Sequence, residues 1–144
     1  MTSFSTPYLD ITYRPEEHVL LGRWLRAVMP FELQQGYAAL LEAAAEYNCR
    51  FWLLDIRRRV GVDSSDVFWI MEEFFPKLQP RLGRTTYLAF LMSPHHLAGV
   101  LANATIPSLT YFDTLPYQLQ RFTDESASLE WLQQQYQQDA VASE

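Results

Sequence analysis

Hydrophobic and polar residues alternate in a short segment near the start of the chain. Between residues 8 and 13, Leu9, Ile11 and Tyr13 share one side and Asp10 and Thr12 the other, which predicts a half-buried strand. A second strand is expected over residues 18–25. The few residues between the two segments include a proline, and such a short connection predicts an antiparallel hairpin.

A helical period replaces this alternation further along the chain. Pro30 suits the first turn of a helix, and apolar residues then recur at helical spacing as far as Tyr47, with Asn48 as a plausible stop. Similar spacing follows at three later places, and either Thr123 or Asp124 can cap the last helix. Helices are therefore expected over residues 30–47, 64–78, 94–104 and from 123 or 124 to about 138.

Two unbroken apolar runs lie among these helices, residues 51–56 with Asp55 near the end, and residues 87–92. Continuous runs of this length are typical of strands that are covered on both faces. The helix between them implies that the two strands are parallel and joined by a right-handed crossover. A last strand is expected over residues 117–122.

In chain order the elements give β-β-α-β-α-β-(α)-β-α. The expected fold class is α/β, with an open mixed sheet of about five strands and helices packed against it. The 144 residues suit a single domain, expected over residues 8–138, with flexible ends at 1–7 and 139–144.

Charge and cysteine content narrow the range of partners. The net charge of −6 disfavours general nucleic-acid binding, since Arg57–Arg59 is the only concentrated basic patch. Cys49 is the single cysteine, so no intrachain disulfide can form; it suits a reducing compartment and is expected to be a small buried hydrophobe. With no secretory signal and no apolar run near membrane-spanning length, we expect a cytoplasmic protein without integral membrane association.

The chain offers little catalytic or metal-binding chemistry. His95 and His96 are adjacent, so their side chains diverge, and no spaced Cys, His or Asp set accompanies them. Glu72 and Glu73 point about 100° apart on a helix, which favours a solvated face over a shared proton. No nucleophile elbow or glycine-rich phosphate loop is present. We therefore expect no catalytic residues, no metal site, no cofactor and no enzymatic activity.

The segment from Asp55 to Asp66 is the most distinctive part of the chain. Asp55 ends a buried strand, and Asp63, Ser64, Ser65 and Asp66 open the next helix, where free N–H groups and the helix dipole favour an anion. Three interpretations stay open: Asp63 or Ser64 caps the helix, the turn is a partner-binding surface, or a serine is phosphorylated.

At these residues the chain resembles a STAS domain, the anti-sigma-factor antagonist fold of the SpoIIAA-like superfamily. That family has a buried strand ending in Asp, then a loop, then Asp-Ser-Ser-Gly at a helix start; here Asp63 follows Asp55 by eight residues. The family's phosphorylated serine maps onto Ser65, but Asp66 replaces the glycine. Because like charges disfavour each other, we expect Ser65 to stay unmodified. Residues 119–122 followed by Trp131-Leu132 are similar to a bacterial STAS/SEC14-like branch.

The resemblance implies a small non-enzymatic bacterial regulatory domain that docks a protein partner through the helix after the Asp-Ser-Ser turn. It also implies an alternative, a SEC14-like domain that binds a lipid or a small apolar ligand in a pocket lined by the abundant aromatic residues. Dimers are common in the family. A homodimer is expected here because one face of helix 64–78 cannot bury Phe68, Trp69 and Phe75 together with its main stripe.

Overall fold

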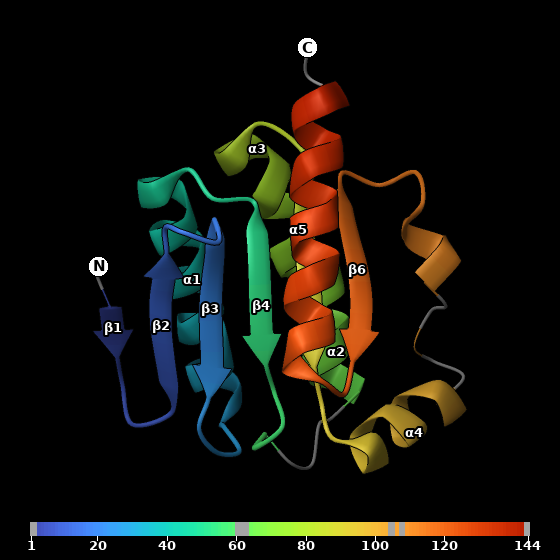
Figure 1. Ribbon diagram of the computed structural model, residues 1–144. Coiled ribbons are helices and arrows are strands. Elements are labelled where there is room, and N and C mark those ends of the chain that lie inside the picture. The colour runs from blue at the N-terminus through green and yellow to red at the C-terminus, as the bar shows by residue number, and fades with distance from the viewer. Residues whose placement is uncertain (1–2, 60–63, 104–105, 107–108, 143–144) are drawn as a thin grey trace.

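The computed structural model describes residues 3–59, 64–103, 106 and 109–142 of the chain. Its centre is one six-stranded sheet whose strands lie in the order of the sequence (Figure 1). The strands are β1 (Ser3–Ser5), β2 (Leu9–Arg14), β3 (Val19–Trp24), β4 (Phe51–Asp55), β5 (Thr86–Leu91) and β6 (Tyr117–Phe122).

The sheet is mixed. β1, β2 and β3 pair in antiparallel fashion, whereas β3, β4, β5 and β6 are all parallel. β4 is buried at every residue, and Leu54 lies between Gly22 of β3 and Phe90 of β5. This is the pattern expected for a central parallel strand with covered faces.

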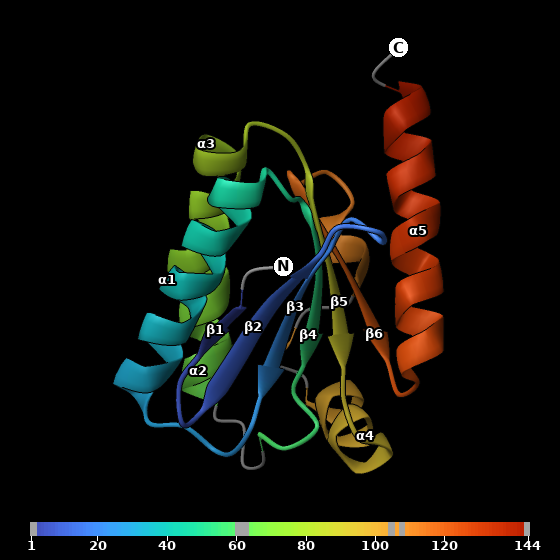
Figure 2. The ribbon, with the colours of Figure 1, turned by 60° about the vertical axis from the view of Figure 1, so that its left-hand side comes forward.

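Helices cover both faces of the sheet (Figure 2). One face carries α1 (Pro30–Tyr47) and a continuous helical segment made of α2 (Ser64–Trp69), a π turn (Ile70–Phe74), a 3₁₀ turn (Phe75–Lys77) and α3 (Leu78–Leu82). The other face carries α5 (Glu125–Ala142). α4 (Pro94–Ala102) lies beyond the carboxyl ends of the parallel strands, and none of its residues is buried.

The predicted α/β fold is confirmed, and several boundaries agree closely. The five expected strands correspond to β2–β6, and α1 spans residues 30–47 as the apolar spacing indicated. Asn48 ends α1 in the left-handed region, with φ 51°, and the carboxylate of Asp124 caps α5 by accepting a hydrogen bond from the Ala127 N–H at 2.9 Å. Cys49 is buried as expected, and burial raises the pKa of its thiol to about 11.

Regular structure extends beyond the domain limits of 8–138. Ser3–Ser5 pairs with β2 as an additional edge strand, and α5 continues to Ala142. The domain is therefore longer at both ends than the pattern of apolar residues indicated. Flexibility at residues 1–7 and 139–144 stays a prediction.

The helix expected over residues 64–78 departs from a regular α-helix. The N–H of Phe75 donates to the carbonyl of Ile70, five residues earlier, and Pro76 has no N–H to donate. The wider turn directs both Phe74 and Phe75 into the core. The expectation that one face cannot bury Phe68, Trp69 and Phe75 together agrees with the structure: Phe75 is buried, Trp69 is half-buried and Phe68 is 65% exposed.

Candidate functional site

Asp55 lies at the carboxyl end of β4, where its carboxylate is surrounded by arginines. It accepts hydrogen bonds from Arg23 Nη1 at 2.7 Å, and from Arg57 through Nε at 2.9 Å and Nη2 at 2.8 Å. Burial alone would raise the pKa of Asp55, but the hydrogen bonds from Arg57 and Arg23 outweigh it and hold the pKa below its usual range. Asp55 is therefore a structural anion that fixes the loop after β4.

Glu125 extends this network to the other face of the sheet. Its Oε1 accepts a hydrogen bond from Arg23 Nη1 at 2.9 Å. This bond is the main reason that the pKa of Glu125 is lowered, and it outweighs burial, which acts in the opposite direction. Arg23 thus links β3, β4 and the first turn of α5 at the carboxyl ends of the strands.

Of the four other candidate residues of this motif, Ser65 and Asp66 have described side chains. Asp63 lies outside the described residues, and Ser64 begins α2 with a side chain that is likewise outside them. Ser65 is exposed, and Asp66 is half-buried and close enough to Tyr37 to act on its pKa. Asp55 therefore interacts with Arg23 and Arg57, whereas Asp66 lies near Tyr37. Capping by Asp63 or Ser64, and the state of Ser65, stay predictions.

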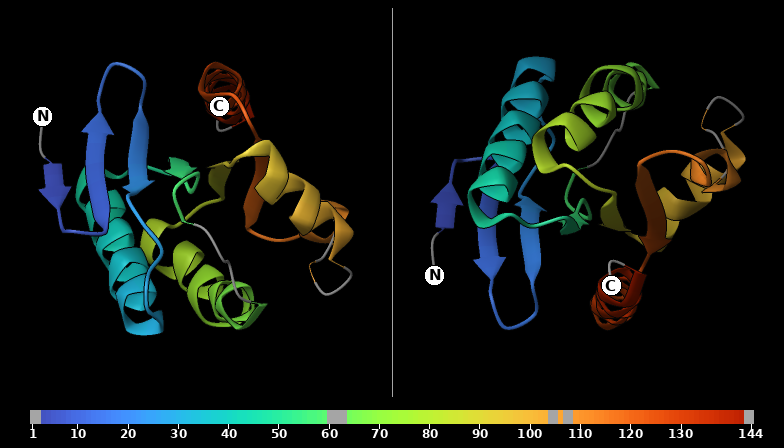
Figure 3. Two further views of the ribbon diagram at one scale, coloured as in Figure 1. Left: turned by 90° about the horizontal axis from the view of Figure 1, so that it is seen from below. Right: turned by 90° about the horizontal axis from the view of Figure 1, so that it is seen from above.

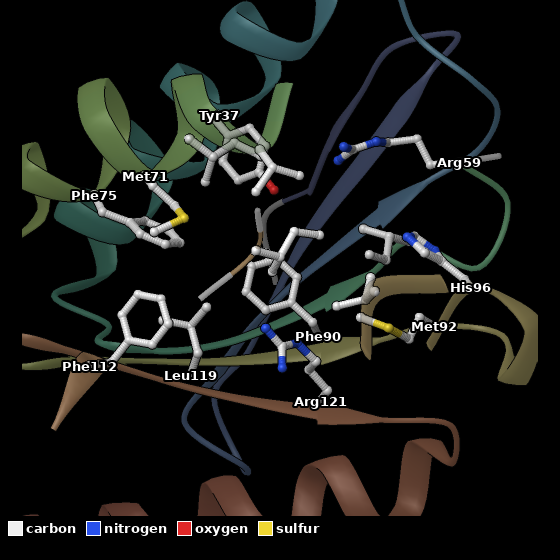
Figure 4. Close-up of a pocket in the computed structure, with 15 residues that line it drawn as sticks. Tyr37, Arg59, Met71, Phe75, Phe90, Met92, His96, Phe112, Leu119 and Arg121 are labelled. Carbon is white, nitrogen blue, oxygen red and sulfur yellow. The ribbon is translucent and has the colours of Figure 1, made fainter. Parts of the chain in front are cut away.

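A cavity that the sequence did not indicate lies between the helical segment after Ser64 and the inner face of β5 and β6 (Figure 4). It encloses about 90 Å³. Helical residues form one wall: Val67, Ile70, Met71 and Phe75. Residues of the sheet and of the turns after its strands form another: Ile56, Phe90, Met92 and Leu119. Val100 of α4, Ile106 and Phe112 of the 3₁₀ turn η3 (Leu109–Phe112) close the outer side.

The cavity exists because the last crossover does not cover the sheet. α1 and the segment from α2 to α3 lie over the inner face of the earlier strands, but α4 lies beyond the strand ends instead of over β6 (Figure 3). α4 buries none of its own residues. The space that a third crossover helix would fill therefore stays partly open.

Tyr37 is the one cavity residue of α1, and its side chain is fully buried. Its hydroxyl points toward the cavity (Figure 4) and has no hydrogen-bond partner among the described residues. Burial raises the pKa of Tyr37, and both the charge of nearby Arg59 and a side-chain interaction between its guanidinium and the hydroxyl act against that rise. An unpaired buried hydroxyl is uncommon in folded proteins and calls for a physical explanation.

Arg59 lies on the same side of the cavity as the Tyr37 hydroxyl (Figure 4) and is only 4% exposed. The guanidinium carbon lies 5.3 Å from the centre of the Trp24 ring, a cation–π contact that holds the side chain in place. No carboxylate among the described residues forms an ion pair with Arg59. A buried positive charge therefore lies at the cavity wall.

Two further basic side chains line the cavity. Burial lowers the pKa of His96, and nearby Arg59 and His95 lower it further, so its imidazole is neutral at pH 7. Burial also lowers the pKa of Arg121, which remains charged because guanidinium groups do not deprotonate in proteins. The polar side of the cavity is thus positive, and the rest of its lining is apolar.

No pattern in the sequence indicates this arrangement, because its residues come from parts of the chain that are far apart in the sequence. Arg57–Arg59 was interpreted as one basic patch, but Arg57 pairs with Asp55, Arg58 is exposed, and only Arg59 turns inward. The position of Arg59, a charged residue shortly after the buried strand β4, is the one feature of the sequence that points to this site.

Other lines of evidence leave the cavity as the main candidate. Within the described part of the chain, no three His, Cys, Asp or Glu side chains gather as metal ligands, and no helix is long and apolar enough to cross a membrane. No family model, curated protein or solved structure matches the chain.

Proposed function

We propose that this chain is a non-enzymatic, cytoplasmic binding domain that holds a small, largely apolar molecule in the cavity between α2, β5 and β6. The observation that carries the proposal is an apolar cavity into which the unpaired hydroxyl of fully buried Tyr37 points. Ligand sites in proteins are typically apolar hollows with a few convergent polar groups. In open α/β sheets they also lie near the carboxyl ends of the strands, as this cavity does.

The volume limits the size of the ligand. A buried apolar cavity of about 150 Å³ accepts benzene, which has six carbon atoms. By proportion, the 90 Å³ of this cavity accommodates an apolar group of about four carbon atoms. α4 buries none of its residues, so this side of the cavity is where ligands would enter.

Xenon is a suitable neutral probe, and Val100→Phe is expected to abolish its binding. Val100 lines the cavity from α4, so a phenyl ring at this position fills the space without entering the packed core. Xenon should shift the backbone amide signals of cavity residues such as Phe90 and Leu119 in the parent protein. In Val100→Phe those shifts should fall by about tenfold or more, since the site no longer exists.

Val141→Phe is the matched control, because Val141 is 72% exposed on α5 and the substitution is the same. This variant should respond to xenon as the parent does. Both variants should also unfold within a few degrees of the parent. Equal xenon shifts in the parent and in Val100→Phe would show that the cavity does not bind small apolar molecules.

A second candidate is the protein-interaction domain that the STAS resemblance implies. Its partner surface would also form the homodimer. The observation in its favour is that Met29, Phe31 and Phe68 are all strongly exposed. These residues lie near the starts of α1 and α2, which are at the same end of one face of the sheet (Figure 3). Exposed apolar side chains gathered in this way are typical of interaction surfaces.

For this second candidate, light scattering at micromolar concentration should show a dimer that Phe68→Ser converts to a monomer. Phe68 has the most exposed of these side chains, so its loss should weaken the contact without disturbing the core. Leu101→Ser on α4 removes a similarly exposed side chain elsewhere and should leave the dimer intact. A monomeric parent protein would refute dimerisation.

A further inference from the structure

The polar groups of the cavity are all donors of hydrogen bonds or carriers of positive charge. Tyr37 has a buried hydroxyl without a partner among the described residues, and Arg59 has a buried guanidinium without a carboxylate among them. The remaining basic lining residues are Arg121 and His96. None of the described lining residues supplies an acceptor that carries negative charge.

The two donors are close to each other. Figure 4 shows the Tyr37 hydroxyl and the Arg59 guanidinium on one side of the cavity, whereas Met71, Phe75, Phe112 and Leu119 gather on the other. Arg59 influences the pKa of Tyr37 directly, which places its charge beside the hydroxyl. The cavity thus has a positive, hydrogen-bonding end at Tyr37 and Arg59 that lies apart from Met71, Phe75 and Phe112, whereas Arg121 lies away from that end, beside Phe90 and Leu119 (Figure 4).

Asp66 is the acidic residue whose charge also acts on Tyr37. It is half-buried and does not line the cavity. The described residues that line the cavity include two arginines, Arg59 and Arg121, and no acidic residue. The field inside the cavity therefore favours an anion, and the low polarity of the other walls strengthens that field.

We infer that the ligand is a small carboxylic acid, with its carboxylate accepting hydrogen bonds from Tyr37 Oη and from the guanidinium of Arg59 and its apolar body against Met71, Phe75 and Leu119. This inference rests on the proposed function and specifies its ligand class. A carboxylate satisfies both donors at once and neutralises the buried positive charge, which a neutral ligand cannot do. An apolar body of about four carbon atoms fills the enclosed 90 Å³, so the carboxylate lies at the edge of that volume, beside Tyr37 and Arg59.

Isovalerate and isovaleramide are the probes that test this inference, because they share one apolar body and differ in charge. At pH 7 in a buffer free of other carboxylates, titrations followed by backbone amide signals should give an affinity for isovalerate about tenfold higher than for isovaleramide. Arg59→Met should remove this preference. It keeps an unbranched side chain beside Trp24 but has no charge.

Tyr37→Phe removes only the hydroxyl and leaves the buried ring. It should lower the affinity for isovalerate by about tenfold while leaving xenon binding unchanged, since the hydroxyl donates to the carboxylate and not to the apolar body. Tyr47→Phe is the matched control: its hydroxyl is also buried without a partner among the described residues, but Tyr47 stacks on Tyr13 and does not line the cavity. Its affinity for isovalerate should equal that of the parent.

The outcomes separate the two proposals. Equal affinities for isovalerate and isovaleramide, with xenon still bound, would overturn the carboxylate and leave the binding function standing. Absence of both isovalerate and xenon binding would overturn both. If Arg59→Met does not fold, Tyr37→Phe still decides the matter, and an unchanged isovalerate affinity in that variant would refute the assigned contact.

Discussion

Leu54→Asp is expected to abolish soluble expression of the protein. Leu54 lies in the middle of β4 with 0% of its surface exposed, between Gly22 on one neighbouring strand and Phe90 on the other. The neighbours across the sheet, glycine and phenylalanine, offer no positive charge to pair with a new carboxylate. An unpaired buried charge costs several kcal/mol, against a total stability of about 5–15 kcal/mol for a domain.

Leu101→Asp is the control for this prediction, because Leu101 is 69% exposed on α4. The same chemical change at this position should alter the free energy of unfolding by no more than about 0.5 kcal/mol. Soluble yield and the far-ultraviolet circular dichroism spectrum would be compared for both variants. A soluble Leu54→Asp protein with the parent spectrum would contradict the position of β4 in the centre of the sheet.

The strands and the long helices could be predicted because each leaves a periodic pattern in the sequence. β4 is an unbroken apolar run since both of its faces are covered, and α1 has an apolar stripe since only one of its sides meets the sheet. β1 could not be recognised in the same way. It is a three-residue edge strand, too short to show alternation.

The helical segment after Ser64 shows where periodicity fails. A regular period of 3.6 residues separates Phe74 from Phe75 by about 100° around the helix, so only one of them would face the core. The π turn before Pro76 inserts the additional residue that lets both become buried. A proline at this position signals an irregular helix, but the sequence does not say which neighbouring turn will widen.

The candidate site could be predicted only in part. Asp55 was correctly placed at the end of a buried strand, but its partners Arg23 and Arg57 come from the neighbouring strand and from its own loop. The cavity depends on α4 lying beyond the strand ends, which is a property of tertiary packing. Tyr37 is one of the apolar residues at helical spacing in α1, and nothing in that spacing indicates that its hydroxyl points toward a cavity.

Trp24 connects the core to this site, and Gly36 of α1 is the residue that makes room for it. A Cβ atom on Gly36 would lie 2.5 Å from Trp24 Cη2 and 3.1 Å from Leu9 Cδ2. Neither neighbour can yield easily, since the indole is almost fully buried and has Arg59 over its ring. Displacing the indole would also move Arg59, one of the two groups assigned to the ligand carboxylate.

Gly36→Ala should therefore destabilise the protein, by about 1–3 kcal/mol, as is usual when volume is forced into a packed core. This is opposite in sign to the gain of up to about 1 kcal/mol that alanine normally brings in place of glycine within a helix. Gly99→Ala provides the comparison, because nothing lies within 4 Å of the new Cβ in α4 and only the helical gain remains. Thermal unfolding should show a lower melting temperature for Gly36→Ala and an equal or higher one for Gly99→Ala. Two variants that both stabilise the protein would show that Trp24 does not pack against α1.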